Sequence, residues 1–212
     1  CALPISMAKT PAAAEDLMQR VWAPAKARVA EEVADMRAIA GHDIEPWDYL
    51  YFAEKVRKQK YDLDQNQLKP YFELHNVRAG SFYMAERLYG FTFERLAPGT
   101  VPVFHEDVVV YAVKDHGEPV GLFYADWFAR PTKRPGAWMN SIRVPNGLLG
   151  ETPIVVNNQN ITPPARGERA LISLDEAQTL FHEFGHGLHG LLSTAHYPSL
   201  SGTAVSRDFV EF

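Results

Sequence analysis

The chain has 212 residues, of which 46% are hydrophobic and 22% charged, and its net charge is −5. This size allows one large domain or two small ones with a buried core. The acidic balance, without any Lys/Arg run, argues against nucleic acid as a partner, and no apolar run approaches the ~20 residues that span a bilayer. Because the single cysteine is Cys1, disulfides within the chain do not stabilise the fold. The sequence is therefore compatible with a protein of a reducing compartment.

The two ends of the chain do not look like natural termini. Residues 1–6 open neither a helix, a strand nor a targeting segment. They are the residues that one reading frame of a common sequencing-adapter tail, TGT GCT CTT CCG ATC T, would encode. Our hypothesis is therefore that residues 1–6 come from the adapter and that the natural sequence begins near Met7. The last residues, 209–212, stop within an apolar and acidic stretch that has no cap, glycine or polar tail. We therefore expect a fragment that is truncated at both ends.

Residues 7–101 are predicted to be a helical segment. The first helix, 10–40, begins with Thr10-Pro11 as N-cap and first-turn proline, ends at Gly41, and has Pro24 as a point where it would kink or divide. Further helices are predicted over 46–58, 64–75 and 79–89. The aromatic residues of the last two are expected in the core: Tyr71, Phe72, Phe82, Tyr83 and Tyr89.

Residues 102–169 are predicted to form a small β-sheet and loops. Residues 108–113 are β-branched and aromatic, a turn follows at 115–118, and 120–128 is apolar again, which indicates a β-hairpin. The remaining elements predicted here are a third strand at 154–157 and Pro/Gly-rich loops at 130–153 and 161–169.

Residues 170–212 are predicted to hold the helices of a metal site. Ser173, followed three residues later by Glu176, is a capping-box pattern that begins a helix over 173–192. Within this helix, His182 and His186 are four residues apart and project from one face, which suits two ligands of a single zinc ion. Glu183 lies beside them as a candidate general base.

The third ligand distinguishes the classes of zinc peptidase. The metzincin pattern needs glycine at 189 and histidine at 192, which here are His189 and Leu192, so this class is excluded. Other classes commonly place a glutamate 23 or 24 residues after the first histidine, where this chain has Val205 and Ser206. His189 shares the face of the two motif histidines, and we expect it to form a hydrogen bond nearby or to contact substrate.

Only two carboxylates follow His186, namely Asp208 and Glu211. Ser206 or Asp208 would cap a short helix with Glu211 in its first turn. We therefore predict Glu211, 29 residues after His182, as the third zinc ligand. Asp208 is expected to be a cap or a hydrogen-bond partner of a ligating histidine.

Three glycines interrupt the motif helix at Gly185, Gly187 and Gly190. Each costs a helix up to ~1 kcal/mol relative to alanine. Their presence indicates that another element packs very close to this helix, or that substrate or metal needs the space.

Together, these residues resemble the thimet oligopeptidase family of zinc peptidases, which includes oligopeptidase A and the bacterial dipeptidyl carboxypeptidases. The resemblance rests on residues 181–192, 201–203 and 207–212, and the family's glutamate ligand corresponds to Glu211. It covers residues 7–212 as part of one catalytic domain. Four upstream segments look most like the dipeptidyl carboxypeptidase branch: 46–49, 67–72, 123–130 and 136–139.

The resemblance implies a mainly α fold with a small β-sheet, the zincin-like catalytic region of a two-lobed helical peptidase. It implies one Zn²⁺ per chain, short peptides as substrates, release of C-terminal dipeptides, and a bacterial cytoplasmic location, with no nucleic-acid or membrane partner. Gly202, like His189 and Asp208, would support a ligand or contact substrate. By analogy, the hairpin and residues 136–140 would offer an edge for an extended peptide. We expect the fragment to be inactive and poorly soluble alone.

Two alternatives stay open at this point. One is an endopeptidase similar to oligopeptidase A. The other, from a different class, is a metal-free peptide-binding relative, against which the intact set of His182, Glu183, His186 and Glu211 argues.

Overall fold

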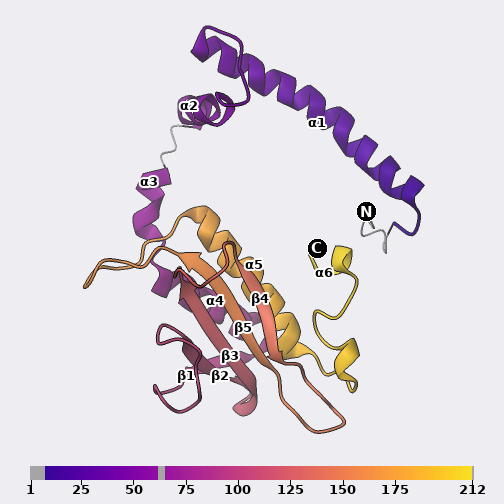
Figure 1. Ribbon diagram of the computed structural model, residues 1–212, viewed down its shortest axis with the longest axis vertical. Coiled ribbons are helices and arrows are strands. Elements are labelled where there is room, and N and C mark those ends of the chain that lie inside the picture. Colours follow the sequence, from indigo (N-terminus) through magenta and orange to yellow (C-terminus); the bar gives the residue numbers. More distant parts are fainter. Residues whose placement is uncertain (1–7, 62–64, 212) are drawn as a thin grey trace. The chain divides into compact units, whose positions relative to one another are not determined.

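The computed structural model describes residues 8–61 and 65–211 (Figure 1). The predictions for residues 1–6 therefore lie outside the described residues. The chain divides into two compact units, one of residues 68–205 and one that joins the chain up to Gln67 with residues from Ser206 onward. Within the described residues, none of the helices combines the length and apolarity needed to cross a membrane.

The first unit contains the long helix α1 (Pro11–Ala40), whose predicted ends are confirmed. The Thr10 hydroxyl accepts a hydrogen bond from the Ala13 backbone N–H, and Gly41 closes the helix with a φ of 74°. Pro24 lies inside α1, which is assigned as one continuous helix. The next helix, α2 (Tyr49–Tyr61), begins later than predicted and packs on α1. The same unit holds α6 (Arg207–Val210).

The helix predicted over 64–75 is wrong in its second half. The chain forms the short helix α3 (Gln65–Leu68) and the 3₁₀ turn η1 (Lys69–Tyr71), and then becomes extended before α4 (Leu74–Tyr89). The Leu74 N–H donates to the Ala170 carbonyl at 2.8 Å, and the Ile172 N–H donates to the Phe72 carbonyl at 2.9 Å. This pairing with a segment far along the chain replaces the helix.

The second unit is built on a five-stranded mixed sheet with the order β1-β2-β3-β5-β4. The predicted hairpin is confirmed, with antiparallel β2 and β3 joined through His116 and Gly117, which both have positive φ. The predicted third strand is confirmed as β5, which pairs in parallel with β3. The strand bounds are β1 (Phe91–Arg95), β2 (Val109–Asp115), β3 (Glu118–Phe128), β4 (Trp138–Arg143) and β5 (Ile154–Ile161).

The residue pattern did not predict two of the strands, and both are edge strands. The edge expected by analogy at 136–140 overlaps one of them, β4, whereas the expectation of an edge at the hairpin is wrong, because β2 and β3 are paired on both sides. The sheet begins at β1, ahead of residue 102, and β4 lies within the segment 130–153 that was predicted to be a loop. Edge strands expose one side of their backbone and much of their side-chain surface, so they carry a weak apolar pattern. In β4, four of the six residues are exposed.

The main core lies between the sheet and the helices α4 and α5 (Leu174–Leu192), which cover the same face (Figure 1). Phe123 from β3 and Phe184 from α5 are both fully buried there. A smaller cluster on the opposite face includes Tyr124, whose hydroxyl donates to the Pro102 carbonyl. The architecture is mainly α-helical with one small sheet, as predicted.

The prediction that five aromatic residues are core is only partly correct. Phe72 and Phe82 pack against the main core. Tyr71, Tyr83 and Tyr89 are 79%, 64% and 47% exposed. A tyrosine keeps its polar hydroxyl in water while its ring covers apolar neighbours, so an aromatic pattern alone overestimates burial.

Candidate metal centre

The zinc-motif helix α5 begins with the predicted capping box. The Ser173 hydroxyl accepts from the Glu176 backbone N–H at 3.1 Å, and the Glu176 carboxylate accepts from the Ser173 N–H at 2.7 Å. Asp175 and Glu176 also place negative charge in the first turn, where the helix dipole favours it. These contacts fix the start of α5 about two turns ahead of the motif.

The two motif histidines converge at their ring nitrogens. The Nε2 atoms of His182 and His186 lie 3.1 Å apart, and the ring planes are at 86° to each other. Two imidazole nitrogens at about 2.0–2.1 Å from one tetrahedral zinc ion would be about 3.3–3.4 Å apart. The pair therefore fits two ligands of a single zinc ion. His182 is exposed and His186 half-buried, so α5 presents this pair away from its buried face.

Glu183 lies beside the histidine pair but is only 7% exposed. It is one of the few charged residues buried in this unit, where unpaired charges are costly. The next residue, Phe184, is fully buried and holds this part of α5 against the sheet. A carboxylate fixed in position at the border between core and open face is suited to accept and pass on a proton.

The glycines of α5 support the first of the two reasons predicted for them, that another element packs very close to this helix. A Cβ at Gly187 would lie 3.1 Å from Asn157 Oδ1, and one at Gly190 would lie 3.0 Å from Val155 Cγ1. The sheet therefore packs very close to these two positions. At Gly185, in contrast, a Cβ would meet nothing within 4 Å, so this part of the helix has open space beside it.

The segment after α5 folds back on the end of that helix. The Gly202 N–H donates to the Ser193 hydroxyl at 3.0 Å. A Cβ at Gly202 would lie 3.1 Å from the Gly190 Cα, and the φ of Gly202 is 54°, so glycine is required on two grounds. His189 is half-buried on α5, beside this returning segment. Contacts of Gly202 or His189 with substrate stay predictions.

The third predicted ligand, Glu211, belongs to the other unit. It is exposed and directly follows α6, so the prediction that it lies in the first turn of a helix is wrong, because this helix is a single turn that ends at Val210. Ser206 occupies the N-cap position without a side-chain hydrogen bond. Asp208 lies within α6, and its side chain is outside the description. Zinc ligation by Glu211 stays a prediction.

Polar residues in β5 are the feature that sequence reasoning missed. Asn157 is fully buried beneath α5, and within the described part of the chain its side-chain nitrogen and oxygen have no hydrogen-bond partner. Asn160 donates to the carbonyls of Arg134 and Gly136 at 2.8 and 2.6 Å. Four consecutive polar residues, 157–160, in a strand that is otherwise apolar were the available signal.

Residues 129–137, which we call the strap, connect β3 to β4. Asn160 contacts the end of the strap next to β4, and a buried ion cluster holds the end next to β3. Asp126, fully buried at the end of β3, receives two hydrogen bonds from Arg130 at 2.7 and 2.8 Å. The Lys133 ammonium donates to the backbone carbonyls of Asp126 and Phe128 and forms an ion pair with Asp126. The strap leads directly into β4, so these contacts position that edge strand.

The charges of the cluster determine its titration. Burial alone raises the pKa of Asp126, but the hydrogen bonds and positive charges of Arg130 and Lys133 outweigh this effect and hold the pKa below its usual value. The shift favours the ionised carboxylate, so Asp126 stays ionised in the folded state at neutral pH.

Comparison with known proteins gives one family. A sequence model described as "Peptidase family M3" matches residues 1–212. The chain is 45% identical to dipeptidyl carboxypeptidase of Escherichia coli strain K12, over 97% of this chain and 31% of that protein. It is 34% identical to oligopeptidase A of the same organism, over 99% of this chain and 32% of that protein. The chain thus spans about a third of the length of these curated relatives.

Proposed function

This chain belongs to peptidase family M3, a family of zinc metallopeptidases, and on that premise we propose that it carries the metal site of an enzyme that releases dipeptides from the C-termini of short peptides. The observation that carries the proposal is the convergent pair of Nε2 atoms on α5 with Glu183 buried beside it. The higher identity to dipeptidyl carboxypeptidase than to oligopeptidase A supports the exopeptidase branch.

We assign His182, His186 and Glu211 as the ligands of one zinc ion. Zinc, when bound, lowers the pKa of a coordinated water to about 7 and polarises the scissile carbonyl. Glu183 accepts a proton from the attacking water and passes it to the leaving amine. His189, Gly202 and Asp208 are proposed as contacts of a ligating histidine or of substrate.

We further propose that the substrate backbone pairs with the edge strand β4. Within the described sheet, β4 pairs only with β5, so its other edge is available for an extended peptide. Met139 of β4 is close to Gly190 of α5, so this edge runs beside the zinc-motif helix. The strap, held by Asp126 and Asn160, sets the position of β4.

The test uses a hybrid enzyme in which residues 7–212 replace the matching segment of Escherichia coli dipeptidyl carboxypeptidase. The hybrid should contain about one zinc ion per chain and hydrolyse short peptides with a free C-terminus. Glu183→Gln should keep the zinc and lower kcat by at least about 10²-fold, the size typical of a lost general base. Glu168→Gln, at an exposed position in a loop, is the control and should leave both the zinc content and kcat unchanged.

The outcomes separate the alternatives. Equal cleavage of free and C-amidated peptides would favour an endopeptidase similar to oligopeptidase A. A well-folded hybrid that purifies without zinc, and still binds peptides, would favour the metal-free relative. Hydrolysis retained by Glu183→Gln would contradict the role assigned to Glu183.

A further inference from the structure

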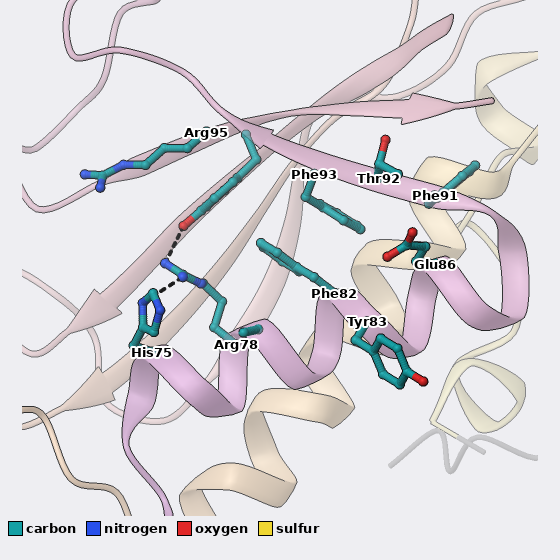
Figure 2. A pocket seen from close by; sticks show the side chains of 11 residues that line it. His75, Arg78, Phe82, Tyr83, Glu86, Phe91, Thr92, Phe93 and Arg95 are labelled. Carbon is teal, nitrogen blue, oxygen red and sulfur yellow. Dashed lines mark hydrogen bonds between the residues drawn. The ribbon is translucent and has the colours of Figure 1, made fainter. Parts of the chain in front are cut away.

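A cavity of about 540 Å³ lies between one face of α4 and the strands β1 and β2 (Figure 2). No residue of the zinc motif lines it. It opens beside β1, and β4 is at the opposite edge of the five-stranded sheet, about 19 Å away at ~4.8 Å per strand. The cavity is therefore separate from the metal site and from the edge proposed for substrate.

One end of this cavity is rich in hydrogen-bond donors. Arg78 donates to the Tyr111 hydroxyl at 2.7 Å, and its other terminal nitrogen lies 2.9 Å from His75 Nδ1. Because the Tyr111 oxygen accepts from Arg78, its own proton is available to a ligand. Among the described residues, no hydrogen bond is found in which Tyr111 is the side-chain donor.

The same end carries a second guanidinium. Figure 2 shows Arg95 extending toward the end of the cavity where Arg78 and His75 lie. Arg95 is exposed, and the described residues include no ion pair to it. Burial raises the pKa of Tyr111, against the opposing charges of the two arginines, so the phenol keeps its proton at neutral pH. A carboxylate suits a phenol donor beside a guanidinium.

The rest of the cavity supplies an apolar wall and a negative charge. Phe82 stacks on Phe93 with the ring centroids 4.1 Å apart. Glu86 lies at the opposite end from Arg78 in Figure 2, and eight residues of α4 separate the two, which is about 12 Å along the helix. A peptide extends about 3.3–3.6 Å per residue, so two or three residues and the reach of the side chains cover this distance.

We propose that this cavity binds a short peptide of two or three residues with both ends free. Its carboxylate lies at Tyr111 and Arg95, its ammonium group at Glu86, and an apolar side chain against Phe82. The opposite charges at the two ends of one aromatic cavity define this ligand class. The proposal does not rest on the peptidase activity, because none of these residues takes part in the zinc motif.

The experiment uses the hybrid enzyme with His182→Ala, which removes a proposed zinc ligand and so weakens competing binding at the metal site. Binding of the tripeptide glycyl-phenylalanyl-glycine, its C-amide and its N-acetyl derivative is measured by equilibrium dialysis and saturation-transfer NMR. We expect saturable binding of the free tripeptide, and about tenfold weaker binding of each derivative, the size of one lost charge-assisted hydrogen bond.

Variants assign the two ends. Arg95→Ala should reduce the difference between acid and amide, because only the Tyr111 hydroxyl then binds the carboxylate. Glu86→Gln should remove the difference between free and acetylated amine. Arg87 is an exposed arginine on α4 outside the cavity, and Arg87→Ala is the matched control. It should leave unchanged both the acid/amide difference and the free/acetylated amine difference in binding.

Three results would overturn the proposal: no saturable binding, equal binding of the amide and the free acid, or the same effect from Arg87→Ala as from Arg95→Ala. A hybrid without zinc or hydrolysis would contradict the peptidase proposal and leave this one standing, so the two failures are distinguishable.

Discussion

Two glycines of α5 differ only in what surrounds them, which makes them a matched pair. Gly185→Ala should raise the free energy of unfolding by up to ~1 kcal/mol, because alanine favours a helix and its methyl group meets nothing. Gly190→Ala should lower it by about 1–3 kcal/mol. There the Met139 methyl can move aside, but Val155 is buried and stiff. Urea unfolding of both hybrid variants tests this, and equal effects would contradict it.

The same pair tests what the space beside Gly185 is for. If Gly185→Ala is more stable than the parent but hydrolyses peptides more slowly, the space serves substrate or metal. Unchanged kcat and KM would assign it to no function.

Side chains were predictable where local spacing decides their position. The convergence of His182 and His186 follows from a four-residue interval on a helix, and the structure shows it. Asn157 and Tyr111 became notable only through neighbours from other elements, the close approach of Gly187 and the guanidinium of Arg78. Such contacts depend on tertiary packing, which spacing does not encode.

The strap between β3 and β4 depends on the ionised state of Asp126. A carboxyl group whose pKa is lowered in the folded state stabilises the fold above its unfolded pKa of about 4, and this contribution is lost as pH falls through the lower folded value. Unfolding measured at pH 7 and pH 3 should therefore show a loss at acid pH. Asp126→Asn should reduce this pH dependence and lower stability at pH 7 by about 3–5 kcal/mol, because the buried Lys133 ammonium loses its only carboxylate among the described ion pairs.

A matched exposed pair provides the control. Glu94→Gln removes the partner of Lys114, but Glu94 is largely exposed, so its loss should change stability little at either pH. A similar loss in both variants would show that the strap cluster contributes no more than a surface ion pair.

At the scale of elements, the sequence predicted what is local or fully buried. The capping box of α5 and the β2–β3 hairpin follow from residues close together in the chain. The edge strand β4 was missed because four of its six residues are exposed, which leaves little apolar alternation. The edge strand β1 was missed because its alternation, Phe91 and Phe93 around Thr92, spans only three residues. The start of α4 was misplaced because the preceding residues pair with 170–172, an interaction that no local pattern encodes.

At the scale of the whole chain, a family match does not place the two units. The M3 match is a property of the sequence, and the histidine pair lies within the unit of residues 68–205. The third proposed ligand, Glu211, belongs to the other unit. A zinc titration of the hybrid addresses this directly. Glu211→Gln should weaken zinc binding strongly, since a carboxylate ligand is lost, whereas Glu183→Gln should not.

The last prediction concerns the apolar stripe of α1, which consists of Leu17, Met18, Val21 and Trp22, all more than half exposed. A contiguous apolar surface of this kind promotes association in water. We expect the 212-residue chain alone to form soluble aggregates, detected by light scattering, that also bind an apolar dye.

Two double variants test the role of the stripe. Leu17→Lys with Trp22→Lys should reduce the aggregation, because it removes the largest apolar groups. Ala27→Lys with Ala30→Lys adds the same charge and leaves the stripe intact, so an equal improvement there would assign the effect to net charge. A monodisperse parent chain that melts cooperatively would contradict the prediction outright.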